Sequence, residues 1–324
     1  MVRKKIMLVS IVSIIAIFSL SLWLTNSASN GILNDGHYVG KGSLGYSTTP
    51  QMQIIWQIQP ELEALPELLI EKIPLNESIV RQIAANAPFN MPADMQFHQI
   101  QWGNNVEYGV YTGSTSSYYL LGFLQNGAMY YLTPGWNGPY AVTSMPSEAE
   151  AKEIADAFLS EVQRSGAFFP TGEQQLVFSS VMPDSVSSNP WGIEQVKSLT
   201  VYYNFEYNGI PIKGGYYGVS VEIGAGGQVL DCFAEWRNLV PSGRNIEITV
   251  TPQQALDNLQ STLSQSPTTS NFTMIVQGVR LVYSCGAGML YDLAPLSPLY
   301  EFNVLLIDAD GQQISSVIHA KATA

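Results

Sequence analysis

The sequence predicts an α+β fold in which antiparallel sheets are each packed by helices. In the stretch from Ser198 to Arg237, apolar residues alternate along three consecutive runs that are separated by glycine-containing turns. A capped, amphipathic helical pattern with antiparallel strand patterns occurs twice, at 147–237 and at 251–320. Because strand side chains alternate between faces and helices repeat every 3.6 residues, these patterns distinguish strands from helices. An apolar N-terminal segment predicts a membrane helix ahead of this body.

The N-terminal segment has the charge pattern of a membrane anchor. Basic residues at 3–5 precede an uncharged, mainly apolar run from Ile6 to Leu24. At about 1.5 Å per residue, a helix over this run matches a hydrocarbon core ~30 Å thick. The basic flank is expected to stay in the cytoplasm. We therefore predict an uncleaved anchor and tether over 1–29, with the body on the extracytoplasmic side of the cell membrane. A signal peptide cleaved after Ser29 is the alternative.

The charge balance excludes some partner classes. Charged residues make up 12% of the chain, about half of the usual share near 25%. The net charge is −12, and without the basic residues at 3–5 the chain carries 11 basic residues against 26 acidic ones. Contacts to phosphates need clustered lysine and arginine, so this composition argues against nucleic acid and against docking flat on an anionic membrane surface.

Residues 36–140 predict a first extracytoplasmic α+β domain. A strand is expected within Gln53–Ile58. Apolar residues at helical spacing over Pro60–Ile73 predict one or two short helices, interrupted at Pro66. Another helix is expected over Asn76–Ala85. Alternating patterns predict strands at 106–111, 118–124 and 128–132, and the last two are joined by an Asn-Gly turn at 126–127.

A second unit is predicted over 145–240, after a segment rich in proline and glycine at 133–139. Ser147 and Glu150 form a capping box, in which each side chain satisfies a free amide at the start of a helix. The apolar stripe of this helix extends from Ala151 to Val162, and Gly166 is placed to end it. Three strands are then expected at 201–207, 217–223 and 230–236, with turns at 208–209 and 224–227.

The third unit, over 250–324, repeats this order of elements. Thr251 and Gln254 form another capping box, with proline at the first helical position. A shorter apolar stripe runs from Ala255 to Leu263. Strands are expected at 274–283, 300–307 and 313–319, and the last two are joined by the turn Asp308–Gly311.

Short motifs in both repeated units resemble the PepSY group of domains. The motifs are Ser147–Ala151, the hairpin Tyr207–Ile212, Gly227–Val229, Thr251–Leu256 and Asp308–Gly311. Together with Val279–Tyr283 and Leu299–Phe302, their order is most similar to the YycH/YycI type of regulatory protein, over about residues 145–324 and in the layout of the anchor.

The resemblance implies tandem PepSY-like units on a single membrane helix. It further implies a non-enzymatic regulatory or adaptor protein that binds a membrane partner, such as a two-component sensor kinase controlling cell-wall metabolism. PepSY-type domains also occur as inhibitory segments of secreted peptidases. A peptidase inhibitor or chaperone-like segment is therefore the alternative, and a structural envelope protein is a second.

The residue types that bind metals are few and scattered. The histidines are His37, His98 and His319, and none stands at the spacing of a ligand set. We therefore predict no metal and no cofactor. Cys232 lies on a predicted strand and Cys285 at the end of another, in an extracytoplasmic body where a disulfide is permitted. The alternatives of a disulfide and of two buried thiols stay open.

No motif indicates a reaction centre. A Gly-x-Ser-x-Gly nucleophile elbow is absent from the sequence. Glu148, Glu150 and Glu153 lie in the first turns of a predicted helix, where acidic residues complement the helix dipole. Gly224–Gly227 lacks the following helix and lysine of a phosphate loop, and Asp308–Gly311 lacks the later glutamate of a calcium loop. We predict no catalytic residues and no enzymatic activity.

Exposed tyrosines form a candidate surface for a protein partner. Several tyrosines are adjacent in pairs, and one of each pair is expected to point out of the core because neighbouring strand residues face opposite ways. The loop 286–298 is apolar and is either a packed crossover or a partner-binding segment. The residues predicted for this surface are Tyr202, Tyr216, Tyr291 and Leu293. Ordinary cover of the second sheet face by a helix is the alternative.

Overall fold

The computed structural model describes residues 52–54, 62–114, 117–134, 145–165, 173–187, 194–213, 218–235, 237–264, 273–284, 295–307 and 311–323. The chain divides into two compact units, which are considered separately. Unit 1 comprises 1–67, 243–287 and 296–324, and unit 2 comprises 68–242 and 288–295. The predicted anchor at 1–29 lies outside the described residues. Within the described residues, no helix is long and apolar enough to cross a membrane.

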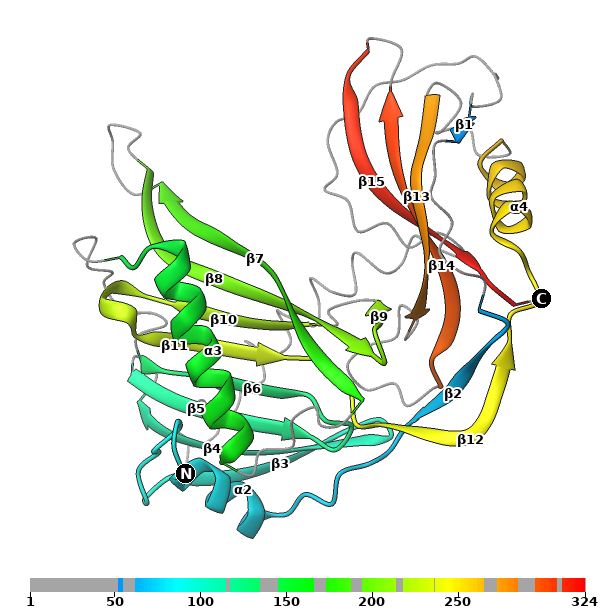
Figure 1. Ribbon diagram of the computed structural model, residues 1–324. Coiled ribbons are helices and arrows are strands. Elements are labelled where there is room, and N and C mark those ends of the chain that lie inside the picture. Colours follow the sequence, from blue (N-terminus) through cyan, green and yellow to red (C-terminus); the bar gives the residue numbers. More distant parts are fainter. Residues whose placement is uncertain are drawn as a thin grey trace. The chain divides into compact units, whose positions relative to one another are not determined.

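Unit 2 is built on one antiparallel sheet with two helices on one face (Figure 1). The strand order is β7-β8-β10-β11-β6-β5-β4-β3, and the short β9 pairs with the end of β8. The strands are β3 (Gln96–Trp102), β4 (Asn105–Ser114), β5 (Ser117–Leu124), β6 (Met129–Leu132), β7 (Gln174–Ser187), β8 (Glu194–Tyr207), β9 (Ile210–Lys213), β10 (Val219–Ile223) and β11 (Val229–Ala234). The helices are α2 (Glu77–Ala85), α3 (Glu148–Arg164) and the single 3-10 turn η2 (Ala225–Gly227).

The face of this sheet that packs against α2 and α3, the helix face, is apolar. One cross-strand row on it runs Phe97, Val110, Leu121, Tyr131, Cys232, Val221, Val201 and Val181. From Val110 to Val201 every member of the row is at most 5% exposed. Burying an aliphatic or aromatic side chain contributes about 1.5–3 kcal/mol, so this row is a principal source of stability in unit 2.

The opposite face, the polar face, carries a different set of side chains in the adjacent row. Its members are His98, Gly109, Gly122, Tyr130, Phe233, Ser220, Tyr202 and Ser180. Glycine is required at both positions because a side chain there would collide with a neighbouring ring. A Cβ on Gly109 would lie 2.3 Å from the His98 ring, and a Cβ on Gly122 would lie 2.1 Å from the Tyr130 ring. The large rings of His98 on β3 and Tyr130 on β6 thus lie over the glycines of β4 and β5.

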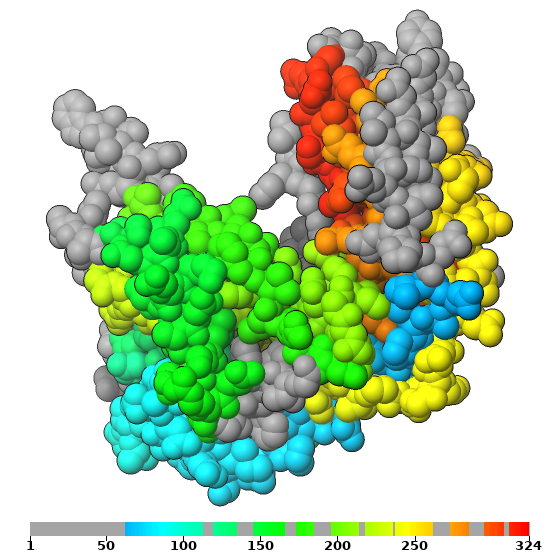
Figure 2. Space-filling view, viewed as in Figure 1, coloured from blue at the N-terminus to red at the C-terminus, as the bar shows by residue number. Residues whose placement is uncertain are grey.

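Both helices of unit 2 begin at a side-chain cap, of which the sequence predicted the one at Ser147. Asn76 caps α2, since its side-chain oxygen accepts from the Ile79 amide at 3.0 Å. For α3, the Glu150 amide donates to the Ser147 hydroxyl at 3.3 Å and the Ser147 amide donates to the Glu150 carboxylate at 2.8 Å. These bonds satisfy amides that have no partner within the helix. Figure 2 shows the outer surface of α3, in green, on one side of unit 2.

Unit 1 has a smaller sheet of order β1-β13-β14-β15 and one helix. The elements are β1 (Met52–Ile54), α4 (Pro252–Ser264), β13 (Thr273–Ser284), β14 (Ser297–Ile307) and β15 (Gln313–Lys321). The core contains Ala255, Leu256 and Leu259 of α4 together with apolar strand residues such as Phe302 and Val304. The predicted capping box is confirmed, because the Thr251 amide donates to Gln254 Oε1 at 2.9 Å and the Gln254 amide donates to Thr251 Oγ1 at 3.2 Å.

The prediction of helix over Pro60–Ile73 is wrong, because this region contains the strand β2 (Ala64–Ile70). It forms a two-stranded sheet with β12 (Leu239–Glu247). Leu65 and Leu68, which are buried, are three residues apart and imitate the spacing of a helix. Pro66 cannot donate a ladder hydrogen bond, but a two-stranded sheet has free edges that tolerate proline. Its carbonyl accepts from the Tyr283 hydroxyl at 2.8 Å.

The predicted division between 36–140 and 145–240 differs from the division into compact units. Strand β6, from the first predicted domain, pairs with β11 from the second in register Tyr131↔Cys232. The helix-face core is continuous across this pair, so residues 68–134 and 145–242 belong to one unit. Apart from 288–295, which are assigned to unit 2, the predicted unit at 250–324 falls within unit 1. The strand part of Gln53–Ile58 that the structure describes is β1, and the remainder lies outside the described residues.

Candidate functional site

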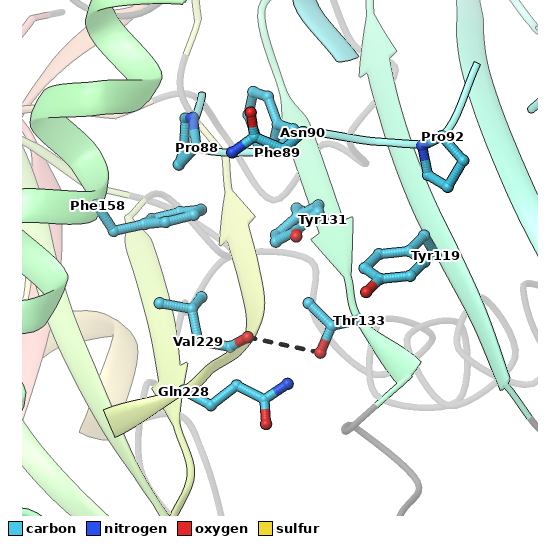
Figure 3. A pocket seen from close by; sticks show the side chains of 10 residues that line it. All are labelled: Pro88, Phe89, Asn90, Pro92, Tyr119, Tyr131, Thr133, Phe158, Gln228 and Val229. Carbon is cyan, nitrogen blue, oxygen red and sulfur yellow. Dashed lines mark hydrogen bonds between the residues drawn. The ribbon is translucent and has the colours of Figure 1, made fainter. Parts of the chain in front are cut away.

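A pocket of about 380 Å³ opens on the helix face of unit 2. It lies between α3, the loop that follows α2, and neighbouring parts of β5, β6 and β11 (Figure 3). The lining residues are Pro88, Phe89, Asn90, Pro92, Tyr119, Tyr131, Thr133, Phe158, Gln228 and Val229. This volume is in the range of small-molecule sites in proteins.

Three aromatic rings form the floor of the pocket. Tyr131 is stacked with Phe158 at 5.9 Å between centroids, and the edge of Phe89 meets Tyr131 at 5.1 Å and Phe158 at 6.3 Å. All three side chains are buried. Phe158 belongs to the apolar stripe of α3 and Tyr131 to the helix face of β6, so the helix–sheet packing itself fixes the rings. Such pairs add about 0.5–1.5 kcal/mol beyond the burial of their area.

Hydroxyl and amide groups surround this floor. Figure 3 shows Tyr119 and Thr133 on one side of Tyr131, with Phe158 on the other. Thr133 donates to the carbonyl oxygen of Leu230 at 3.0 Å. Among the described residues, the Tyr131 hydroxyl has no hydrogen-bond partner. Burial, followed by the nearby Tyr119 and Cys232, raises the pKa of Tyr131 to about 12, so its hydroxyl stays protonated and available as a donor.

The lining is uncharged. Of the described residues that form it, none is an acid, a base, a histidine or a cysteine. Of the side chains that serve in general acid–base catalysis, the described lining has only the tyrosines Tyr119 and Tyr131. The described lining residues therefore carry no formal charge.

On the polar face of unit 2, Glu107 is the centre of a hydrogen-bond network. His98 Nε2 lies 2.8 Å from Glu107 Oε1, Trp102 Nε1 donates to Oε2 at 2.9 Å, and the Tyr130 hydroxyl also donates to Oε1. Burial alone would raise the pKa of Glu107. The hydrogen bonds from His98, Tyr130 and Trp102 and the charge of His98 outweigh burial and lower this pKa. Glu107 is thus a charged group held within the sheet.

Two further carboxylates lie side by side on the polar face, one on β10 and one on β11. Asp231 is the register partner of Glu222, and Glu222 accepts a hydrogen bond from the buried Ser198. Burial and the neighbouring charge of Glu222 raise the pKa of Asp231 to about 7, against a smaller opposing effect of Lys197.

Unit 1 contains a comparable arrangement of a histidine and a buried glutamate. Arg280, Glu301 and His319 are register partners across β13, β14 and β15. Arg280 Nε donates to Glu301 Oε1 at 2.6 Å, and His319 Nε2 lies 3.3 Å from Oε2. These side chains belong to one cross-strand row, and the residues that line the pocket of unit 2 do not include them. His37 lies outside the described residues. No group of potential metal ligands occurs within the part of the chain that the structure describes.

Of the four residues predicted for the partner surface, the structure describes only one. Tyr202 lies on the polar face and is 39% exposed, whereas its neighbour Tyr203 is buried on the helix face. Tyr216, Tyr291 and Leu293 lie outside the described residues. Cys232 is a buried free thiol. Cys285 lies outside the described residues, and a free Cys232 corresponds to the alternative of two buried thiols.

The pocket was not predicted from the sequence. Its lining comes from segments that are far apart in the chain, at 88–92, 119–133, 158 and 228–229. One signal pointed towards it, namely the adjacent tyrosines at 118–119 and 130–131. Each pair contributes one ring to the pocket.

The comparisons with known proteins identify no family. No family model matches the chain, and neither does any curated protein. Among solved structures, the chain is similar to an uncharacterized protein from Eubacterium rectale, with 11% identity and a TM-score of 0.47. That likeness covers 83% of this chain and 87% of the other. The resemblance to PepSY domains and to the YycH/YycI type stays a prediction.

Proposed function

We propose that the chain is a non-enzymatic regulatory or adaptor protein, anchored by residues 6–24, whose extracytoplasmic body binds a membrane partner such as a two-component sensor kinase. The anchor, the acidic body and the resemblance to the YycH/YycI type support the location and the class of partner. The proposal that unit 2 binds and does not catalyse is carried by one observation, the uncharged lining of its pocket.

The placement of the titratable groups supports the same proposal. His98 and His319 each lie against a buried glutamate within a sheet. Such pairs hold strands together, and the pocket lining does not include them. Tyr202 supports the binding role, since an exposed tyrosine on a sheet supplies amphipathic contact area of the kind enriched at interfaces.

The test is co-purification of a sensor kinase with the tagged full-length chain from membranes. We expect the kinase to be recovered with the wild type and to be lost when an unrelated membrane span replaces residues 6–24. Tyr202→Ala should reduce recovery, whereas Phe178→Ala should not. The two side chains are similarly exposed, at 39% and 41%, but Phe178 lies on the helix-face side of the edge strand β7. Equal recovery with all variants, or no recovery with the wild type, would contradict the proposal.

A further inference from the structure

We propose that strand β7 of unit 2 is a surface for self-association, and that it pairs antiparallel with β7 of a second copy of this chain about a twofold axis. This inference goes beyond the proposed regulatory function and does not depend on it. β7 forms an edge of the unit 2 sheet, and among the described residues it pairs with β8 alone (Figure 1). The backbone groups on its outer side are thus placed to pair with another strand.

Exposed apolar side chains are concentrated on this strand. The described part of the chain has six large apolar side chains that are exposed, and three of them, Val177, Phe178 and Met182, lie close together on β7. Their exposed fractions are 38%, 41% and 56%. A fourth, Tyr202, lies beside them on β8 as the register partner of Ser180. Single exposed apolar residues are ordinary, whereas a cluster of them indicates a surface that a partner covers.

A bulge in β7 gives these side chains a symmetric arrangement. The register between β7 and β8 shifts by one residue between Phe178 and Ser180. Because of this shift, Phe178 and Val181 both lie on the helix face, and Val177 and Met182 both lie on the polar face. Each face thus has one apolar residue before the bulged segment and one after it, at equal distances from its centre.

This symmetry makes the strand complementary to itself. In an antiparallel pairing centred on the bulged segment, Phe178 faces the partner's Val181 on the helix face, and Val177 faces the partner's Met182 on the polar face. The twofold axis repeats both contacts, so each chain places four apolar side chains in the interface. Apolar cross-strand pairs of this kind stabilise a sheet, and the twofold symmetry closes the assembly at two copies.

The strand also lets two acidic chains meet without opposing like charges. The chain has a net charge of −12, so two copies repel one another at long range. Residues 174–182 of β7 include no charged side chain. In the same register Asp184, the first acid after this segment, faces the partner's Gln175, whose amide can donate to a carboxylate. A second copy therefore supplies, by its own sequence, a strand of matching spacing and charge.

The test measures the mass of the purified full-length chain in detergent by light scattering. We expect the wild type to form dimers at about 100 μM. Val177→Lys and Met182→Glu each place a charge opposite an apolar side chain of the second copy, and each should weaken the dimer at least about tenfold. Both positions are exposed in the single chain, so the substitutions leave its core intact. An equimolar mixture of the two variants should recover dimers, because the new lysine of one then faces the new glutamate of the other.

The matched control is Ile314→Lys, which should dimerise like the wild type, since Ile314 is 53% exposed on β15 of unit 1. The proposal is overturned if the wild type is monomeric at this concentration, which would leave the edge of β7 to a different chain. It is also overturned if either Val177→Lys or Met182→Glu dimerises as the wild type does, because the association would then use another surface, such as the predicted anchor. A mixture that stays monomeric, or a control that dissociates like Val177→Lys, would equally contradict the pairing of β7 with itself.

Discussion

Replacing Asp231 with asparagine should remove a loss of stability that the wild type shows as the pH rises towards neutrality. Asp231 on β11 is the register partner of Glu222 on β10, and Glu222 also accepts from Ser198. Burial and the charge of Glu222 raise the pKa of Asp231 from its ordinary value of 3.8 to about 7, while Lys197 opposes this rise. Ionised Asp231 is therefore less favourable in the folded chain than in the unfolded chain.

The sign and size of the effect follow from the two pKa values. Between pH 3.8 and about 7 the folded state binds more protons than the unfolded state, so the free energy of unfolding falls as pH rises through this interval. The contribution of protonated Asp231 to the free energy of unfolding is fully present below the pKa of the unfolded state. It is lost as the pH rises through the pKa of the folded state. At about 1.4 kcal/mol per pH unit, the loss is at most about 4 kcal/mol, and partial exposure of Asp231 makes it smaller.

Urea unfolding of the purified full-length chain, followed by circular dichroism between about pH 5 and 8, measures this effect. The wild type should lose stability over this range, and Asp231→Asn should be more stable at the upper end and have a flatter profile. Asp94→Asn, at an exposed position before β3, is the control and should follow the wild type. If the wild type and Asp231→Asn had parallel profiles, the assignment of the slope to Asp231 would be refuted.

Three further substitutions test the packing and the caps by the same unfolding measurement. Glu107→Ala leaves three donors facing a cavity and should destabilise by about 3–5 kcal/mol; a loss below about 1 kcal/mol would show that the network is not buried. Gly122→Ala places a Cβ 2.1 Å from the Tyr130 ring and should cost about 1–3 kcal/mol, and unchanged stability would contradict this contact. Ser147→Ala removes the side-chain cap of α3 and should cost about 1 kcal/mol, and unchanged stability would contradict this cap.

Local chemistry explains which elements the sequence predicts well. The starts of α2, α3 and α4 depend on a side chain and an amide only three residues away, so Asn76, Ser147 and Thr251 mark them without knowledge of the rest of the fold. Strands were also predicted at 106–111, 118–124 and 201–207, where the apolar alternation is strong, and they fall within the longer β4, β5 and β8.

The missed elements lack that contrast between faces. Strand β7 pairs with β8 but is largely exposed and rich in serine, so its apolar residues do not alternate. Strands β3 and β12 were not predicted for the same reason, since most of their residues are polar or only partly buried. The pairing of β6 with β11 joins segments about a hundred residues apart, and no local pattern in a single sequence reports such a contact. The pocket depends on this pairing, and it was missed for that reason.

The two glycines of the polar face also bear on how the β3–β6 meander assembles. His98 and Tyr130 each need a partner without a side chain, and Gly109 and Gly122 provide these spaces at a single alignment of the four strands. A slip by two residues would keep the apolar and polar faces but would drive each ring into a bulky neighbour. Clashes of the His98 and Tyr130 rings therefore disfavour misaligned hairpins that would still have one apolar and one polar face.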